Sequence, residues 1–326
     1  MTYVPFLIGT VALPAAVILL TAAGERVLIR FRHDISAKFR PWLWLSPLII
    51  ATGVVVLFPI FYTFALSFKG QDGTGWVGLD NFAYAFGEAM RPILLNNLVW
   101  LIALPLGVTA VAVLLAVLID RIRWEALART ILVLPTAVSL VAGAVTWRNL
   151  YAYAPPGRNQ LGIFNAMLQG IGLDPVAWTS RGPGPTQWLN NVSLVVVAVW
   201  AFLGIALLVL SAAVKSIPEE MVEAARLDGA TEWSIFVHIT LPSLWPSILT
   251  VITTQAIFAI KIFDIVYVMT NGNNATNVVG NQIFSNLFNR PNELGHAAAL
   301  AVVLLAAAAP IIWFNIRSVR QQGATS

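Results

Sequence analysis

The stretch EAARLDGATEWSIFVHITLP, Glu223 to Pro242, carries several charges but lies between two long apolar runs. Five of the fifteen carboxylates of the chain fall between Glu219 and Glu232. Apolar runs of this length are typical of helices that cross a membrane, and such helices rarely carry charge. The stretch is therefore expected to lie outside the hydrocarbon, as a folded connection between two spans.

The residue types in this connection predict a short helix, a glycine turn and a second short helix. The pattern from Ser216 to Glu219 fits a capping box that opens the first helix, which would run to about Asp228. Gly229 is placed to end it, because glycine accepts the left-handed conformation of a helix end. Thr231 can cap the second helix, and Pro242 would mark its end before the next span. The two short helices and the turn between them would form a projection, here called the knob, that is shaped to dock into a groove on another protein.

The composition places the whole chain in a membrane. Of its 326 residues, 58% are hydrophobic and 10% charged, and the mean hydropathy is +0.79, whereas soluble domains carry about 25% charged residues. The net charge of +4 is too small and too scattered to indicate nucleic-acid binding. The chain has no Cys, and its three His lie far apart in sequence, so we expect no disulfide and no metal site.

Seven membrane spans are expected, which gives an all-α polytopic protein; the resemblance described below implies that the first is an extra N-terminal helix before a core of six. The first is expected to remain as an anchor, because its positive charges follow the apolar run, whereas those of a signal peptide precede it. The spans are roughly 3–23, 43–68, 93–119, 129–150, 192–214, 246–270 and 297–316.

The distribution of Lys and Arg predicts the orientation of the spans. Loops rich in these residues stay in the cytoplasm. Twelve of the nineteen lie on one side, which is the side of the loop 24–41, of the loop 120–129, of the Glu223–Pro242 stretch and of the C-terminal tail. Six lie on the other side, and Lys261 falls inside a span. The N-terminus is therefore expected outside, and the C-terminus and the docking knob in the cytoplasm.

The Glu223–Pro242 stretch resembles the EAA motif of the permease subunits of ABC importers. That motif reads E-A-A, three residues, G, nine residues and I-x-L-P, and this chain matches each element at its spacing. The matching residues, with Asp228 beside the glycine, are Glu223, Ala224, Ala225, Asp228, Gly229, Ile239, Leu241 and Pro242. The resemblance implies that these residues form a cytoplasmic coupling helix and its support between the fifth and sixth spans.

Further stretches resemble carbohydrate-uptake permeases of the maltose type, and the α-glucoside branch in particular. They are PWLWLSPLIIATGVVVLFPIFYTFALSF, WVGLDNFAYAF, NNLVW, ILVLPTAVSLVAGAVTW, KIFDIVYVMTNG and IIWFNIR. The resemblance covers roughly residues 42–320. It suggests an N-terminal helix and basic loop over 1–41, a permease domain over 42–320 that contains the coupling loop 216–242, and a cytoplasmic tail over 321–326.

The resemblance also implies partners and a mechanism. Two permease subunits, most often different ones, form the pathway in a prokaryotic cytoplasmic membrane, and an external solute-binding protein delivers the sugar. Two cytoplasmic ATPase subunits bind ATP and magnesium and drive the coupling helices. This chain shows no G-x-x-x-x-G-K-[ST] pattern for a phosphate-binding loop. It is therefore expected to be no enzyme and to hold no cofactor. Its sugar would be an α-glucoside such as maltose, trehalose or a related oligosaccharide.

Candidates for contact with the sugar are polar and aromatic residues within the spans. Lys261 and Asp264 lie three apart, which would place them on one face of the sixth span. They would form either an internal ion pair or a substrate contact. Sugars also need aromatic faces and amides, and the candidates of this kind are Asn97, Trp200 and Gln255.

Two other classes of membrane protein compete with this interpretation. A secondary transporter would use inverted repeats and intramembrane acids, but the sequence shows no repeat, and Asp264 is the one acid well inside an expected span. A membrane enzyme would need a cluster of carboxylates or His at an interface. Neither class accounts for the Glu223–Pro242 stretch.

Overall fold

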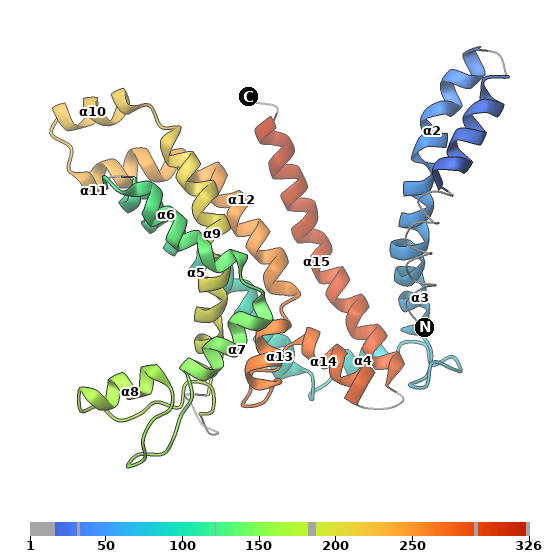
Figure 1. Ribbon diagram of the computed structural model, residues 1–326. Coiled ribbons are helices and arrows are strands. Elements are labelled where there is room, and N and C mark those ends of the chain that lie inside the picture. Colours follow the sequence, from blue (N-terminus) through green and yellow to red (C-terminus); the bar gives the residue numbers. More distant parts are fainter. Residues whose placement is uncertain (1–16, 31–32, 121, 182–186, 290–292, 324–326) are drawn as a thin grey trace, which may run out of the picture. The chain divides into compact units, whose positions relative to one another are not determined.

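The computed structural model describes residues 17–30, 33–120, 122–181, 187–289 and 293–323 (Figure 1). Regular structure within these residues is helical, and an isolated bridge between Lys69 and Trp76 is the nearest approach to a strand there. The chain divides into two compact units, Met1–Ala65 and Leu66–Ser326. The expected all-α architecture is confirmed.

The first unit holds a helix over residues 17–28 and the helix α2 (His33–Thr52). A π-helical turn, η1 (Gly53–Leu57), joins α2 to α3 (Phe58–Leu66), which ends at the start of the second unit. In the apolar window of Lys38–Leu66 no residue is buried within this chain. That surface is left for lipid or for another protein. The expected span 3–23 falls largely outside the described residues.

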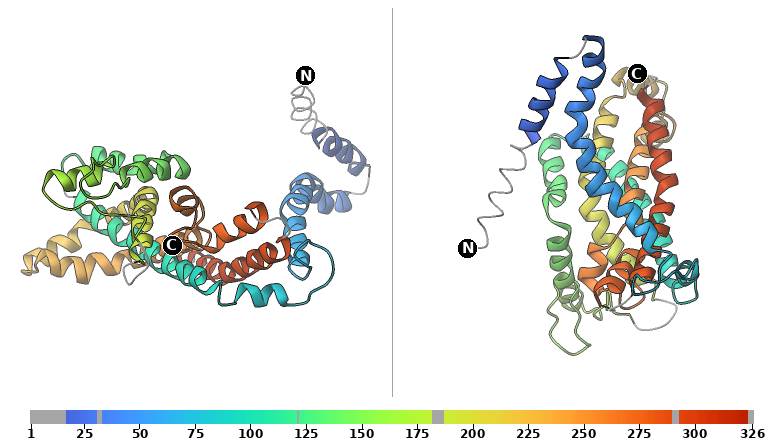
Figure 2. Two further views of the ribbon diagram at one scale, coloured as in Figure 1. Left: turned by 90° about the horizontal axis from the view of Figure 1, so that it is seen from below. Right: turned by 90° about the vertical axis from the view of Figure 1, so that its right-hand side faces the viewer.

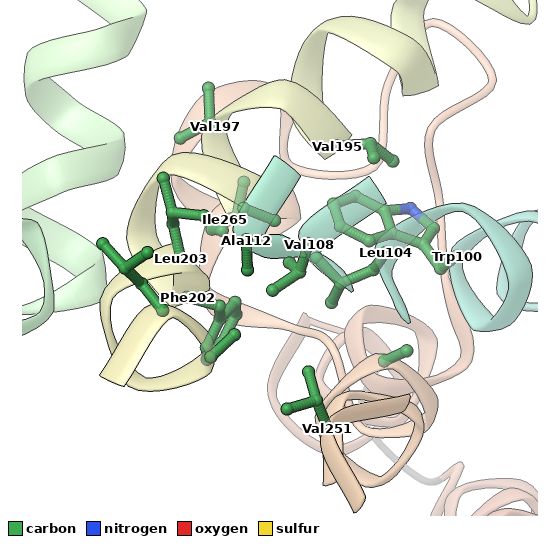
Figure 3. Packing of buried hydrophobic residues seen from close by; sticks show 14 of the residues in the cluster. Trp100, Leu104, Val108, Ala112, Val195, Val197, Phe202, Leu203, Val251 and Ile265 are labelled. Carbon is green, nitrogen blue, oxygen red and sulfur yellow. The ribbon is translucent and has the colours of Figure 1, made fainter. Parts of the chain in front are cut away.

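The core of the second unit is built from α5 (Arg91–Ile119), α9 (Leu189–Lys215) and α12 (Leu241–Ile260). Figure 3 shows Trp100, Leu104 and Val108 of α5 facing Val251 of α12. Small residues let α5 and α9 approach closely, and a Cβ added at Gly107 would lie 3.1 Å from the Val199 side chain. Close packing of small residues replaces the hydrophobic driving force that a bilayer does not provide.

The remaining helices occupy the two ends and the flanks of this core. At one end lie α10 (Glu219–Leu227), α11 (Glu232–Ile235) and the π-helical turn η3 (Phe236–Thr240). At the other end lie α8, α13 and α14 (Figures 1 and 2). The bounds of the elements at that end are α4 (Asp80–Ala85), α8 (Ile163–Gly170), α13 (Asp264–Thr270), α14 (Val279–Phe284) and η4 (Ser285–Asn289). The long helix α15 (Leu294–Gly323) packs on α12, and its C-terminal end lies at the same end of the unit as α10.

The expected span 129–150 is not one straight helix. It consists of α6 (Glu125–Val133), the 3₁₀ turn η2 (Leu134–Ala137) and α7 (Leu140–Leu150), and the pair is bent by 101°. Proline lacks the N–H of a helix interior and its ring clashes with the preceding turn. Pro135 lies at the start of η2, so the helix breaks there.

The expected span 246–270 is also broken. Helix α12 ends at Ile260, and α13 begins at Asp264 after an irregular link. The described residues hold five helices that are long and apolar enough to cross a membrane, or six if the bent pair is one span. The polytopic character of the chain is therefore confirmed, whereas two of its spans are shorter or more bent than the hydropathy indicated.

Candidate functional site

Helix α10 projects from the end of the second unit, and none of its residues is buried. The capping box expected at Ser216 is wrong, because Ser216 closes α9 and its hydroxyl donates to the carbonyl of Ala213 at 2.7 Å. The residue before α10 is Pro218, which makes no side-chain cap. The first helix of the knob therefore begins at Glu219, held in place chiefly by the segments at its two ends.

The glycine turn is confirmed. Gly229 has a φ of +84°, which side-chain-bearing residues rarely adopt. Its N–H donates to the carbonyl of Arg226 at 3.1 Å, and the N–H of Ala230 donates to that of Ala225 at 2.9 Å. These two bonds form a Schellman motif, which satisfies carbonyls that the helix end would otherwise leave unpaired.

An ion pair across the turn holds the two short helices together. Arg226 Nε donates to Glu232 Oε1 at 2.9 Å. This hydrogen bond raises the pKa of Arg226 above its ordinary value. Both side chains are about half exposed, so the pair adds more to the geometry of the turn than to stability.

Thr231 caps α11 as expected, since its hydroxyl accepts from the N–H of Ser234 at 3.2 Å. The expected helix end at Pro242 is wrong. Helix α11 continues through η3 into α12, and Pro242 lies in the first turn of α12. The π-helical turn widens the backbone just before the proline, where an α-helix would clash with the proline ring. The part of the stretch from Glu232 onward is thus continuous with the core helix α12.

The exposed tip of the knob is both acidic and apolar. Glu223, Ala224, Asp228 and Gly229 are exposed, and Ala225 is half-buried. Large apolar side chains stand in the open beside them, with exposed fractions of 89% for Leu227, 73% for Trp233 and 48% for Met221. Sequence reasoning did not single out Trp233, although a tryptophan in a charged loop is itself a signal of an interface.

The other end of the stretch lies closer to the core. Ile239 and Leu241 are half-buried, Pro242 is exposed, and Ile235 is 2% exposed. Ile235 is the buried residue that fixes the α11 part of the knob to the rest of the unit. The motif residues therefore divide into an exposed group on and after α10 and a supporting group at the start of α12.

Of the two roles expected for Lys261 and Asp264, the internal ion pair on one helix face is wrong. The two residues belong to different elements, because α12 ends before Lys261 and Asp264 begins α13. No ion pair joins these two described side chains, and Lys261 Nζ lies instead 5.3 Å from the centre of the Phe258 ring. Lys261 is exposed and Asp264 half-buried.

Asn97 has both ends of its amide engaged by backbone. Its Nδ2 donates to the carbonyl of Ile260 at 3.2 Å, and its Oδ1 accepts from the N–H of Val279 at 2.7 Å. It thereby satisfies the last carbonyl of α12 and the first N–H of α14, which the helices themselves leave unpaired. This geometry supports a structural role for the side chain at the break after α12.

The other two pathway candidates lie in separate surroundings. The indole of Trp200 packs on Gly143, where a Cβ would lie 3.1 Å from Cζ3, and its ring centre lies 5.7 Å from that of Trp147. Gln255 is 2% exposed, and its Oε1 has no hydrogen-bond partner among the described residues. The structure thus gives Trp200 an aromatic partner and leaves Gln255 as a buried polar group in α12.

Comparison with known families gives a match over most of the chain. The model of the binding-protein-dependent transport system inner membrane component matches residues 41–317. The alpha-glucoside transport system permease protein AglF of Rhizobium meliloti is 37% identical over 88% of this chain and 84% of its own. The osmoprotective compounds uptake permease protein GgtC of Synechocystis is also 37% identical, over 86% of this chain and 99% of its own.

Solved structures share the fold. A bacterial alginate ABC transporter in complex with an alginate pentasaccharide-bound periplasmic protein contains a chain that matches with a TM-score of 0.72. The match is 24% identical and covers 88% of this chain and 96% of that one. At this identity the likeness concerns the arrangement of the helices.

Proposed function

This chain belongs to the family of binding-protein-dependent transport system inner membrane components, and we propose that it forms half of the translocation pathway of an ATP-driven sugar importer. It is a multi-pass permease subunit and not an enzyme. The observation that carries the proposal is the exposed α10–Gly229–α11 knob, continuous with the core helix α12. A projection with uncovered apolar residues at its tip is suited to enter a groove on a partner.

The proposed partner of the knob is a cytoplasmic ATPase, of which the importer would hold two copies. Glu223 would make a charge-assisted contact with a basic group in the ATPase groove, and Leu227 and Trp233 would fill apolar positions in it. ATP and magnesium would bind to that partner. Movement of the knob would pass into α12 through η3 and into α9 through its end at Lys215.

The opposite end of the unit, where α8, α13 and α14 lie, would face the external binding protein (Figure 1). The knob and the end of α15 would then be cytoplasmic, in agreement with the distribution of Lys and Arg. A second, similar permease would complete the pathway. Asn97, Trp200, Gln255, Lys261 and Asp264 stay candidates for contact with the sugar, and for Asn97 a structural role is the better supported one.

The proposed substrate is an α-glucoside, such as maltose, trehalose or a related oligosaccharide. The support is the 37% identity to a permease named for alpha-glucosides. Relatives at lower identity are named for other sugars, with 27% for the arabinooligosaccharides permease AraP of Bacillus subtilis and 26% for the lactose permease LacF of Rhizobium radiobacter.

Purification of the chain with its partners tests this function. We expect a phosphate-loop ATPase and a second permease to co-purify in mild detergent. In proteoliposomes ATP hydrolysis should rise about tenfold when the binding protein and maltose or trehalose are added together. A chain that purifies without ATPase would contradict the coupling role. Stimulation by lactose or arabinooligosaccharides but by no α-glucoside would contradict the substrate class.

Charge reversal at Glu223 tests the contact with the ATPase. Because a hydrogen bond to a charged group contributes about 1.5–3 kcal/mol, Glu223→Lys should lower sugar uptake about tenfold or more. The variant should still reach the membrane, since the residue is exposed. Glu88→Lys makes the same charge change at an exposed residue at the opposite end of the unit, and the ATPase should still co-purify with it with unchanged basal hydrolysis. Wild-type uptake by Glu223→Lys would remove Glu223 from the coupling surface.

A further inference from the structure

The cytoplasmic end of α9 is tied to the bent span by an ion pair. Lys215 is the last residue of α9, immediately before the linker to α10. Its Nζ lies 2.8 Å from Glu125 Oε1 and 3.0 Å from Glu125 Oε2. Glu125 is the first residue of α6, 90 positions earlier in the chain. The pair thus joins the root of the knob to the start of a different span.

The Glu125 carboxylate is shared between two cations. Besides Lys215 it pairs with Arg129, one turn along α6. The Glu125 side chain is 21% exposed, against 48% for that of Lys215. A carboxylate shielded from water between two positive groups is held more firmly than an isolated surface pair. Without it, Lys215 and Arg129 would face each other with like charges.

A second contact joins α6 to α9 further along. At Gly204 of α9 an added Cβ would lie 2.6 Å from Thr136 Cγ2 and 2.9 Å from the Cα of Val133. Such close approach leaves α6 and η2 no room to slide over α9 at this point. The α6–η2 part of the bent span is therefore held to α9 by a packed contact as well as by the ion pair.

Helix α10 itself has little contact with these helices. A cleft of about 730 Å³ opens beside it, lined by Asp120, Glu125, Lys215, Val222 and Arg226 among others. Because α10 buries none of its residues, a displacement of α10 enters the unit through its two ends. One end leads to α11 and α12, and the other leads through the linker to Lys215.

We propose that Glu125 is a positioning residue that acts through Lys215. Their ion pair makes the start of the bent span α6–η2–α7 follow the movement of the knob. The inference rests on the proposed coupling function. In this arrangement α9 and α6 move together at the cytoplasmic end. The 101° bend follows η2, at the far end of the helical segment whose start the ion pair holds.

Amide substitutions test the ion pair. Glu125→Gln and Lys215→Gln should each keep the complex assembled with its ATPase and keep basal ATP hydrolysis within about twofold. Uptake, and the rise of ATP hydrolysis on adding the binding protein and its sugar, should fall about fivefold or more. Uptake by the double variant should be no lower than uptake by either single variant, because all three lose the same interaction. Lys215→Arg keeps the positive charge, so its uptake should be close to that of the wild type. Arg123→Gln removes an exposed charge from the same loop and is the matched control.

A covalent link provides a second measurement that a simple folding defect would not reproduce. The chain contains no Cys, so Glu125→Cys with Lys215→Cys introduces its only thiols. Transport by this double variant, in a complex whose other subunits lack reactive thiols, should be low when reduced. It should recover when a short bis-methanethiosulfonate reagent joins the two residues through a disulfide at each end, with loss of methanesulfinate.

The outcomes separate the two proposals. Wild-type uptake in both amide variants, or no recovery on cross-linking, would overturn the role of Glu125 even if Glu223→Lys fails to transport. Loss of the ATPase from the wild-type complex would overturn the coupling function itself, and with it this inference.

Discussion

Gly229→Pro is expected to abolish sugar uptake while the chain still reaches the membrane. Proline is locked near a φ of −65°, whereas Gly229 has a φ of +84°. The substitution also removes the N–H that donates to Arg226. The turn would have to open, and α10 would leave its place beside α11. Uptake in proteoliposomes, with membrane content measured by immunoblot, should fall about fiftyfold or more.

The chain offers a closely matched control in Gly172, which follows α8 at the other end of the unit. Its φ is +80°, its N–H donates to Gln169 at 3.1 Å, and that of Leu173 donates to Leu168 at 2.9 Å. A Cβ would meet nothing within 4 Å at either glycine. Gly172→Pro thus breaks the same motif away from the knob, and the ATPase should still co-purify with it. Equal loss of the ATPase from both variants would show that global misfolding, rather than coupling, explains the result.

Asn97→Leu is expected to destabilise the protein rather than to weaken substrate affinity alone. The change leaves the Ile260 carbonyl and the Val279 N–H without their hydrogen bonds. Each unpaired buried group costs about 1–3 kcal/mol. The midpoint of thermal unfolding in detergent should therefore fall by about 5 °C or more. Asn289→Leu replaces an exposed asparagine and should leave the midpoint unchanged.

The alternative result for Asn97 would be equally clear. If its amide mainly contacts the sugar, Asn97→Leu should raise the sugar concentration needed for half-maximal uptake and leave the thermal midpoint unchanged. That combination would return Asn97 to the pathway. It would also show that water satisfies the freed backbone groups at the break after α12.

The knob was the most predictable part of the structure, because its features are local. Glycine at a left-handed position and threonine at a cap act through neighbours within five residues. Gly229 and Thr231 take the conformations that the sequence indicated. The apolar spans were predictable for a similar reason, since hydropathy summed over about 20 residues does not depend on which helix lies alongside.

Prolines were the least reliable signal. Pro135 lies in the 3₁₀ turn that precedes a sharp bend, whereas helices continue past Pro59 and Pro242. At Pro59 and Pro242 a π-helical turn ends two residues before the proline, η1 at Leu57 and η3 at Thr240, whereas α5 continues past Pro105 without one. Whether a proline breaks a helix or is absorbed depends on what packs against it. Around Pro135 the neighbouring α9 offers Gly204, which leaves room for Val133 and Thr136 to lie against it.

The sequence by itself determined the all-α polytopic class of the protein, the turn at Gly229 and the cap at Thr231, because hydropathy, glycine conformation and such a cap are properties of short segments. The tertiary structure alone decided where α12 stops, why Lys261 and Asp264 do not pair, and that Glu125 meets Lys215 across 90 positions. These features depend on which side chains another helix presents, such as Asn97 at the end of α12. Whether a backbone group at a helix end or a charged side chain finds a partner depends on contacts between distant segments. Patterns within a short stretch of sequence do not predict those contacts.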